Sequence, residues 1–265
     1  MATIGCDVTQ QITSNVDLFK SIMQQNVIEN DFNREYAPLA TIQPGVAIEF
    51  TVKGANDLYL DLNILRLDVL AMITKADGTN IDANTASPIN MTQHSMFRNI
   101  GFELCVRNVG DTRQLYPYQS HLTSLLNFCK ETQKTRFLCL GSTKDTSGHI
   151  NVTAVGGNNA GLNARAATFA KSTLVELISR PHLDGFNLER LIPPNIDLNM
   201  KLMPSPNNYV CKSAAPGQGA QQKNYKLVIQ SVNLIINTTK LTSTAHGALM
   251  DLLLQQNMRH HLSRV

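Results

Sequence analysis

The chain contains no tryptophan and few charged residues, and both shortages limit what it can be. Aromatic residues make up 6% of the 265 positions and charged residues 16%, with a formal net charge of +3 at pH 7. A positive charge this small and this scattered does not indicate sequence-specific binding of nucleic acid. The lack of tryptophan counts against a sugar-binding protein. A weakly charged surface favours a protein whose surface is largely covered by partner molecules.

The chain also lacks a signal peptide, a membrane-length apolar run and paired cysteines. Residues 1–11 have no apolar core of the kind a signal peptide needs, and no run of about 18 apolar residues occurs. The five cysteines are widely spaced, without a Cys-x-x-Cys pair, and they are Cys6, Cys105, Cys129, Cys139 and Cys211. This pattern is typical of free thiols in a reducing compartment. We therefore expect a protein that is made and kept inside the cell, is not secreted by a signal peptide and has no membrane partner.

No catalytic or cofactor-binding motif is present. The sequence has no Walker loop, dinucleotide fingerprint, nucleophile elbow or His-Glu-x-x-His helix. A cupin-type metalloenzyme is an alternative, but it needs two histidines and a carboxylate close together, and His182 with Asp184 has no partner histidine nearby in the sequence. The adjacent His260 and His261 would point in opposite directions on a strand. The prediction is a protein that is not an enzyme and has no metal, cofactor or small-molecule substrate.

Apolar residues alternate with polar ones over most of the chain, and this period of two predicts β-strands. The predicted strands cover residues 45–52, 58–73, 100–106, 173–178, 196–202 and 225–236. The pattern changes phase at Asn63–Ile64 and again between Ile229 and Val232, as a β-bulge would require. A hairpin turn is predicted at residues 108–111, where the sequence reads Asn-Val-Gly-Asp.

Helical patterns occur only in the connections and near the two ends. One covers residues 14–28, and its apolar stripe is Val16, Phe19, Ile22, Met23 and Val27. Another begins at Pro117, which a first helical turn tolerates, and its apolar stripe is Leu122, Leu125, Leu126 and Cys129. A last one covers residues 243–257. Because helices do not alternate with strands, the predicted fold class is mostly β: an antiparallel jelly-roll sandwich with short helices inserted in the connections.

A series of short blocks follows an order that is found in a known family. The blocks are Ile48–Val52, Asp57–Leu62, Ile73–Asn80, Pro88–Asn90, His94–Phe97, Tyr116–Tyr118, Lys144–His149, Arg180–Phe186, Tyr225–Leu227 and Ala245–Val265. Together they resemble the double-jelly-roll major capsid protein of Polinton/Maverick elements and adintovirus-like viruses, over nearly the whole chain.

The resemblance implies two barrels standing side by side, with three chains forming a pseudo-hexagonal capsomer of an icosahedral shell around DNA. It implies that the partners are copies of the chain itself and other capsid proteins. It also implies a location in the virion, after assembly in the nucleus or cytoplasm of the host cell. The family's protein is longer and continues into a second barrel. This chain is therefore similar to the first, N-terminal barrel alone, as in a truncated or domesticated copy of an endogenous viral element.

The resulting prediction is a structural capsid subunit that self-assembles into a shell. It has an N-terminal arm at residues 1–44, a jelly-roll barrel at 45–240, and a C-terminal helix and junction toward an absent second barrel at 241–265. The predicted subunit contacts are Val16, Phe19, Ile22 and Met23 in the arm, and Tyr116, Pro117 and Tyr118 at the start of the inserted helix. The alternative is a jelly-roll binding module, lectin-like or cytokine-like, with no catalytic role.

Overall fold

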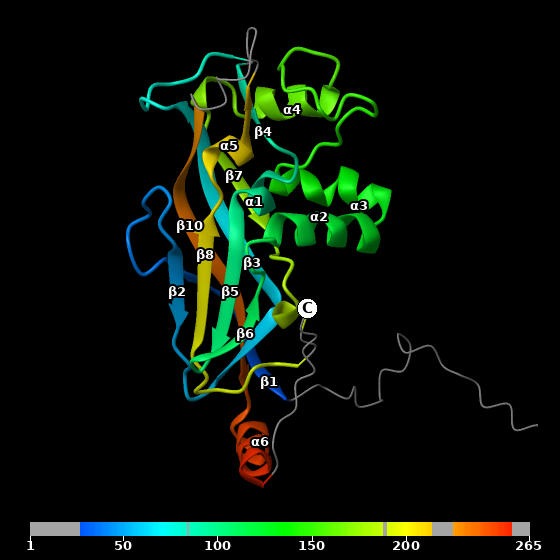
Figure 1. Ribbon diagram of the computed structural model, residues 1–265. Helices are drawn as coiled ribbons and strands as arrows, with labels where there is room; N and C mark the ends of the chain where they lie inside the picture. Colours follow the sequence, from blue (N-terminus) through cyan, green and yellow to red (C-terminus); the bar gives the residue numbers. More distant parts are fainter. Residues whose placement is uncertain (1–26, 84, 188–189, 214–224, 256–265) are drawn as a thin grey trace, which may run out of the picture.

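The computed structural model describes residues 27–83, 85–187, 190–213 and 225–255. Figure 1 shows an elongated body of β-strands with most helices gathered along one side. In the part of the chain described, the strands form two four-stranded sheets and one two-stranded sheet. Sheet A contains β1 (Ile28–Tyr36), β10 (Tyr225–Leu241), β3 (Leu58–Lys75) and β7 (Val175–Ser179), in that order. Sheet B contains β2 (Ile48–Val52), β8 (Leu198–Pro204), β5 (Phe97–Leu104) and β6 (Arg107–Asp111).

The strand pairs are nested in the sequence. β5 pairs with β6, β3 with β7, β2 with β8 and β1 with β10, all antiparallel. The chain is thus one long antiparallel ribbon whose tip is the β5–β6 hairpin. Pairing of β10 with β3 and of β8 with β5 rolls this ribbon into two facing sheets. This connection pattern is a jelly roll, so the predicted fold class is confirmed.

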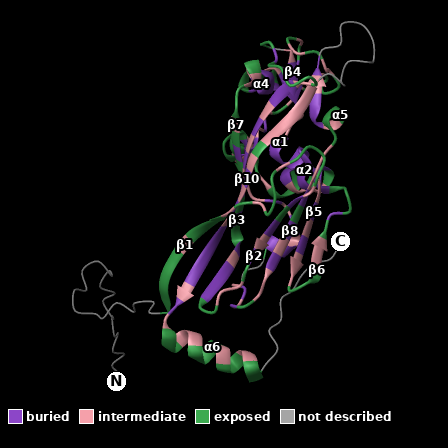
Figure 2. Cartoon of the chain, turned by 90° about the vertical axis from the view of Figure 1, so that its left-hand side faces the viewer, coloured by how far each residue is buried: buried purple, intermediate pink, exposed green. Residues whose placement is uncertain are grey.

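The alternating side chains build the core between the two sheets. In β2, Ile48, Phe50 and Val52 are buried while Glu49 is exposed. Residues from both sheets share one apolar cluster, for example Leu67 and Leu234 from sheet A with Phe102 from sheet B. Figure 2 shows the buried residues along the strands and the exposed ones on β1 and α6. The alternation of apolar and polar residues in the sequence therefore reflects the burial of one face of each sheet.

Both predicted phase shifts are irregularities in the pairing of β3 with β10. The first falls between Ile229 and Ser231 of β10. The second lies between Ile235 and Asn237, which pair with Arg66 and Asp61, so that the four residues 62–65 of β3 stand opposite one residue of β10. Such a wide bulge bends the strand and projects part of it outward.

The β5–β6 turn lies earlier than the sequence pattern predicts. Cys105 and Val106 take φ values of 45° and 68° and form the turn, as a two-residue hairpin of this kind requires. The predicted turn residues, 108–111, lie within β6. There the pairing shifts between Phe102 and Glu103, which pair with Gly110 and Asn108, so Val109 is the extra residue of a β-bulge.

Sheet A includes a strand from the range predicted as the N-terminal arm. Residues 28–36 belong to the predicted arm, but they form the edge strand of sheet A. The sequence of this strand does not alternate between apolar and polar residues, because most of its side chains are exposed. Its polar side chains bind β10 instead: Asp31 accepts a hydrogen bond from Thr239 at 3.1 Å, and Glu35 accepts one from Asn233 at 2.6 Å.

The remaining elements lie in the connections. The two-stranded sheet pairs β4 (Ala86–Pro88) with β9 (Cys211–Ser213). The α-helices are α1 (Thr92–Ser95), α2 (Tyr116–Asn127), α3 (Lys130–Lys134), α4 (Ala160–Thr168), α5 (Asn207–Val210) and α6 (Ser243–Gln255). The short 3-10 helices are η1 (Arg136–Leu140), η2 (Ala170–Ser172) and η3 (Asp184–Phe186). Between β6 and β7, α2, α3, η1 and α4 follow one another and make up most of the helical side of the body in Figure 1.

Candidate functional site

Helix α2 has three distinct faces. It begins at Tyr116, after a turn in which Arg113 and Gln114 take positive φ values, and Pro117 occupies its first turn. The face toward the barrel is buried. It holds the first two residues of the helix, Tyr116 and Pro117, and two serines, Ser120 and Ser124. The face away from the barrel is apolar and exposed, and it consists of Leu115, Tyr118, Leu122, Leu125 and Leu126. The third face, with Gln119, Thr123 and Asn127, lines a cleft.

Tyr116 anchors the start of α2 to two histidines from other elements. Its hydroxyl lies 2.7 Å from Nδ1 of His94, which is part of α1, and accepts a hydrogen bond from the backbone N–H of His182 at 3.3 Å. The two imidazole rings lie side by side, with 4.7 Å between centroids. Ser124 of α2 is 3.4 Å from Nε2 of His182. The cluster therefore joins α2, α1 and the segment after β7.

Burial keeps this cluster uncharged at neutral pH. Burial lowers the pKa of His94 well below its usual value, and the neighbouring His182 lowers it further. Burial, followed by the charge of Arg180, lowers the pKa of His182 to about 4. Burial also raises the pKa of the Tyr116 hydroxyl. Two neutral imidazoles can stack at this distance, whereas two imidazolium ions would repel each other in a poorly solvated place.

A cleft of about 970 Å³ separates α2 and η1 from the end of β7. The ring of Phe128 contacts the rings of both Phe137 and His182, and the three side chains supply apolar surface on the helical side. On the strand side, the wide bulge of β3 presents Asn63 and Ile64 to the cleft. Its volume is in the range of sites that hold a small molecule or a few residues of peptide.

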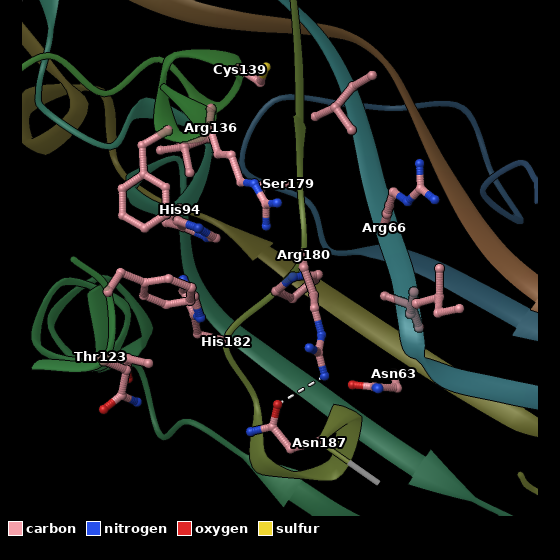
Figure 3. Close-up of a pocket in the computed structure, with 18 of the residues that line it drawn as sticks. Asn63, Arg66, His94, Thr123, Arg136, Cys139, Ser179, Arg180, His182 and Asn187 are labelled. Atoms are coloured by element: carbon pink, nitrogen blue, oxygen red, sulfur yellow. Dashed lines mark hydrogen bonds between the residues drawn. The ribbon is translucent and has the colours of Figure 1, made fainter. Parts of the chain in front are cut away.

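The cleft carries charges of both signs on its lining. Arg66, Arg136 and Arg180 line it, together with Glu176 and Asp184. Figure 3 shows Arg136 reaching from η1 toward β7 beside Ser179, while Arg180 turns the other way toward Asn187. Arg180 donates to the Phe186 carbonyl at 2.5 Å and to Asn187 Oδ1 at 2.9 Å.

None of these three arginines forms an ion pair with a carboxylate of the described residues. Burial lowers the pKa of Arg180, and the nearby Asp61 raises it in part. The guanidinium groups are therefore held by neutral acceptors or by solvent within this part of the chain.

The structure brings together only part of the predicted contact set. Val16, Phe19, Ile22 and Met23 lie outside the described residues. Tyr116 and Pro117 are buried within the chain's own fold, whereas Tyr118 is 60% exposed, with its ring 6.5 Å from that of Tyr209. The predicted apolar stripe of α2 exists, but Leu122, Leu125 and Leu126 point away from the barrel.

Sequence reasoning missed the histidine pair. His182 does have a partner histidine in space, His94, which lies 88 positions earlier in the sequence, too far for any spacing motif to indicate. In the described ranges, no group of three His, Cys, Asp or Glu side chains is placed to hold a metal ion. A search of the same residues finds no helix long and apolar enough to span a bilayer.

Comparisons with known proteins identify relatives in fold only. No protein-family model matches the chain, and no curated protein does. The quasi-atomic structure of the PBCV-1 virus capsid matches with a TM-score of 0.50 and 10% identity, over 87% of this chain and 46% of that one. A chain of the cryo-EM structure of the Sputnik virophage matches with a TM-score of 0.59 and 10% identity, over 91% and 54%. The Faustovirus major capsid protein matches with a TM-score of 0.54 and 9% identity, over 89% and 58%.

These matches confirm the predicted resemblance to double-jelly-roll major capsid proteins at the level of the fold. The chain spans about half the length of the capsid chains it matches.

Proposed function

We propose that this chain is a structural, non-catalytic subunit of a viral-type capsid, built on the first barrel of a double-jelly-roll protein, and that it assembles with copies of itself into a shell. The fold shared with viral capsid chains supports the proposal, and the outward leucines of α2 are its main support. In this proposal the unit of assembly is a trimeric capsomer. The further partners are other capsid proteins, and the location is the virion. An origin in a Polinton/Maverick-type element, as a truncated or domesticated copy, is supported by the order of the sequence blocks.

The apolar face of α2 has the composition of a subunit contact. Leu122, Leu125 and Leu126 are 57%, 55% and 81% exposed, and they lie next to one another at helical spacing. A large apolar patch on the surface is unusual for a protein that acts alone. Burying one leucine side chain fully is worth about 1.5–3 kcal/mol, so three of them can supply much of the energy of a stable contact.

Other exposed apolar side chains lie on α2 and on η1. Tyr118 lies one turn before Leu122 on α2, and Leu138 of η1 is 56% exposed. The barrel side of α2 is already filled by its own residues, so among the described residues these side chains lie outside the core. A second copy of the chain offers the same apolar face, which suits the symmetric contacts that most homo-oligomers form.

The test is self-association of the full chain measured by sedimentation velocity over a range of micromolar concentrations. We expect wild-type protein to form oligomers as its concentration rises. The Leu122→Glu/Leu126→Glu variant should remain monomeric because two carboxylates would have to be buried at the contact. Its thermal unfolding and circular dichroism should stay close to those of the wild type.

Leu39→Glu is the matched control, because Leu39 is 64% exposed on the loop before β2. This variant should associate like the wild type. A wild-type chain that stays monomeric, or a double variant that associates as well as the control, would contradict the proposal.

A further inference from the structure

The cleft beside α2 combines an apolar wall with arginines that form no ion pair with a carboxylate of the described residues. Phe128 and Phe137 pack edge to face, 5.2 Å between ring centroids, and His182 lies 5.7 Å from Phe128. Within this part of the fold, the buried Nε2 atom of His94 also has no hydrogen-bond partner. An apolar wall with unpaired polar groups at its edge is the arrangement of a site that binds an amphipathic ligand.

Arg136 is a charge that a ligand in the cleft can reach. It is exposed at the start of η1, and Figure 3 shows its side chain extending over the cleft. Arg180 lies deeper, is half-buried, and binds a backbone carbonyl and an amide rather than a carboxylate. A guanidinium that has lost part of its hydration gains from a carboxylate, which accepts two hydrogen bonds in the same plane. The cleft thus favours a ligand with a carboxylate beside apolar side chains.

The chain itself contains a segment with these properties. Residues 14–23, which we call the arm segment, read Ser-Asn-Val-Asp-Leu-Phe-Lys-Ser-Ile-Met. Its one carboxylate, Asp17, lies between apolar residues, and Phe19 and Lys20 follow within three positions. Phe19 matches the aromatic wall of the cleft. Lys20 provides the opposite charge for Glu176, which lines the same cleft.

We propose that the arm segment of one copy docks in the cleft between α2, η1 and the end of β7 of a neighbouring copy, with Asp17 at Arg136 and Phe19 against Phe128 and Phe137. The inference rests on the proposed self-association, and it deepens it by adding a second contact to the leucine face. The two contacts lie on adjacent faces of α2, so one neighbour can use both.

Site-specific photo-crosslinking in the full chain tests the location. A photoreactive phenylalanine analogue replaces Phe19, and equal amounts of ¹⁴N- and ¹⁵N-labelled chains are mixed before irradiation. Mass spectrometry of the crosslinked peptides should find position 19 joined to residues 123–140, in pairs that combine the two isotopes. Crosslinks within one chain only, or crosslinks to any other surface, would overturn the inference.

A charge exchange tests the chemistry. We expect Arg136→Asp to reduce the intermolecular crosslink about tenfold, and Asp17→Arg to do the same, because each places like charges together. The chain with both changes should recover most of the crosslink. Arg107→Asp, which reverses an exposed charge on β6, is the matched control and should leave the yield unchanged. Equal losses in the single variants and the double variant would overturn the proposed pairing.

The two proposals fail in different ways. If the wild type associates, and Leu122→Glu/Leu126→Glu prevents it, while position 19 crosslinks elsewhere, only the arm inference is wrong. If the wild type stays monomeric and yields no mixed-isotope crosslink, both are wrong.

Discussion

Helices α2 and α4 lie in the same connection between β6 and β7, yet they bury opposite kinds of side chain. On α4 the buried residues include Leu162 and Ala166, and its last turn ends at a buried Phe169. On α2 the side toward the barrel holds serines, and the leucines face outward. An inserted helix that completes its own barrel turns its apolar residues inward. A helix that turns them outward leaves an apolar surface exposed.

The polar contacts of the two helices differ in the same way. Arg165 of α4 is only 2% exposed, and its guanidinium donates to the carbonyls of Pro88 and Thr143 and to Asp145 at 2.8 Å. The start of α2 is held by Tyr116 and two uncharged histidines. The first attachment depends on a buried ion pair, and the second depends on histidines whose pKa values burial lowers.

Removing the Arg165 side chain should have the largest effect on stability. Arg165→Ala leaves Asp145 and two backbone carbonyls without their donor, and the loss of one partner of a buried ion pair costs about 3–5 kcal/mol. Urea unfolding of the full chain would measure the difference. Arg107→Ala on the exposed strand β6 is the control and should change stability by less than about 0.5 kcal/mol. A loss below about 1 kcal/mol for Arg165→Ala would show that α4 is not held by this network.

Acidification should weaken the attachment of α2. The pKa of His182 is about 4 in the folded chain, and an unfolded histidine has a value near 6.5. The unfolded state therefore binds more protons between these values, and stability is lost as the pH falls from about 6.5 to about 4. The loss from His182 amounts to at most about 3–4 kcal/mol, and His94 acts in the same direction.

Urea unfolding at about pH 7 and about pH 4.5 checks this, with wild type compared with His182→Gln. The variant should lose less stability on acidification because glutamine does not titrate. His121→Gln, an exposed position on α2, is the control and should behave like the wild type. Equal pH dependence in wild type and His182→Gln would contradict the assigned role of the pair.

The smallest effect is expected on the leucine face of α2. Leu126→Ala should change the stability of the monomer by less than about 0.5 kcal/mol, because this side chain is 81% exposed. The same change at Leu162 of α4, which is fully buried, should cost about 2–5 kcal/mol. Thermal or urea unfolding of dilute protein measures both. A large loss for Leu126→Ala would mean that α2 packs its leucines within one chain.

Pattern recognition in the sequence located most of the strands. Period two predicted the strands with one buried face, such as β2 and β8, and phase shifts predicted both irregularities between β3 and β10. It missed β1, because an exposed edge strand shows no alternation. It misplaced the β5–β6 turn, because Cys105 and Val106 adopt positive φ without the glycine or asparagine that usually marks such a turn.

The candidate site was only partly visible in the sequence. The helix at Pro117 and its apolar stripe were predicted, and Tyr118 is exposed as a contact residue should be. The direction of the stripe was not predictable, since a helical period shows that one face is apolar but not what covers it. His94 and His182 became neighbours only through the folding of α1 against the segment after β7.

The spacing of apolar residues can be seen in the sequence, and it is enough to predict an antiparallel β-sandwich because burial of one strand face depends on local alternation. The nesting of the strands, the outward side of α2 and the set of charges that share a cleft become visible only in the folded chain. These features depend on contacts between residues far apart in the chain, and such contacts leave no period in the sequence.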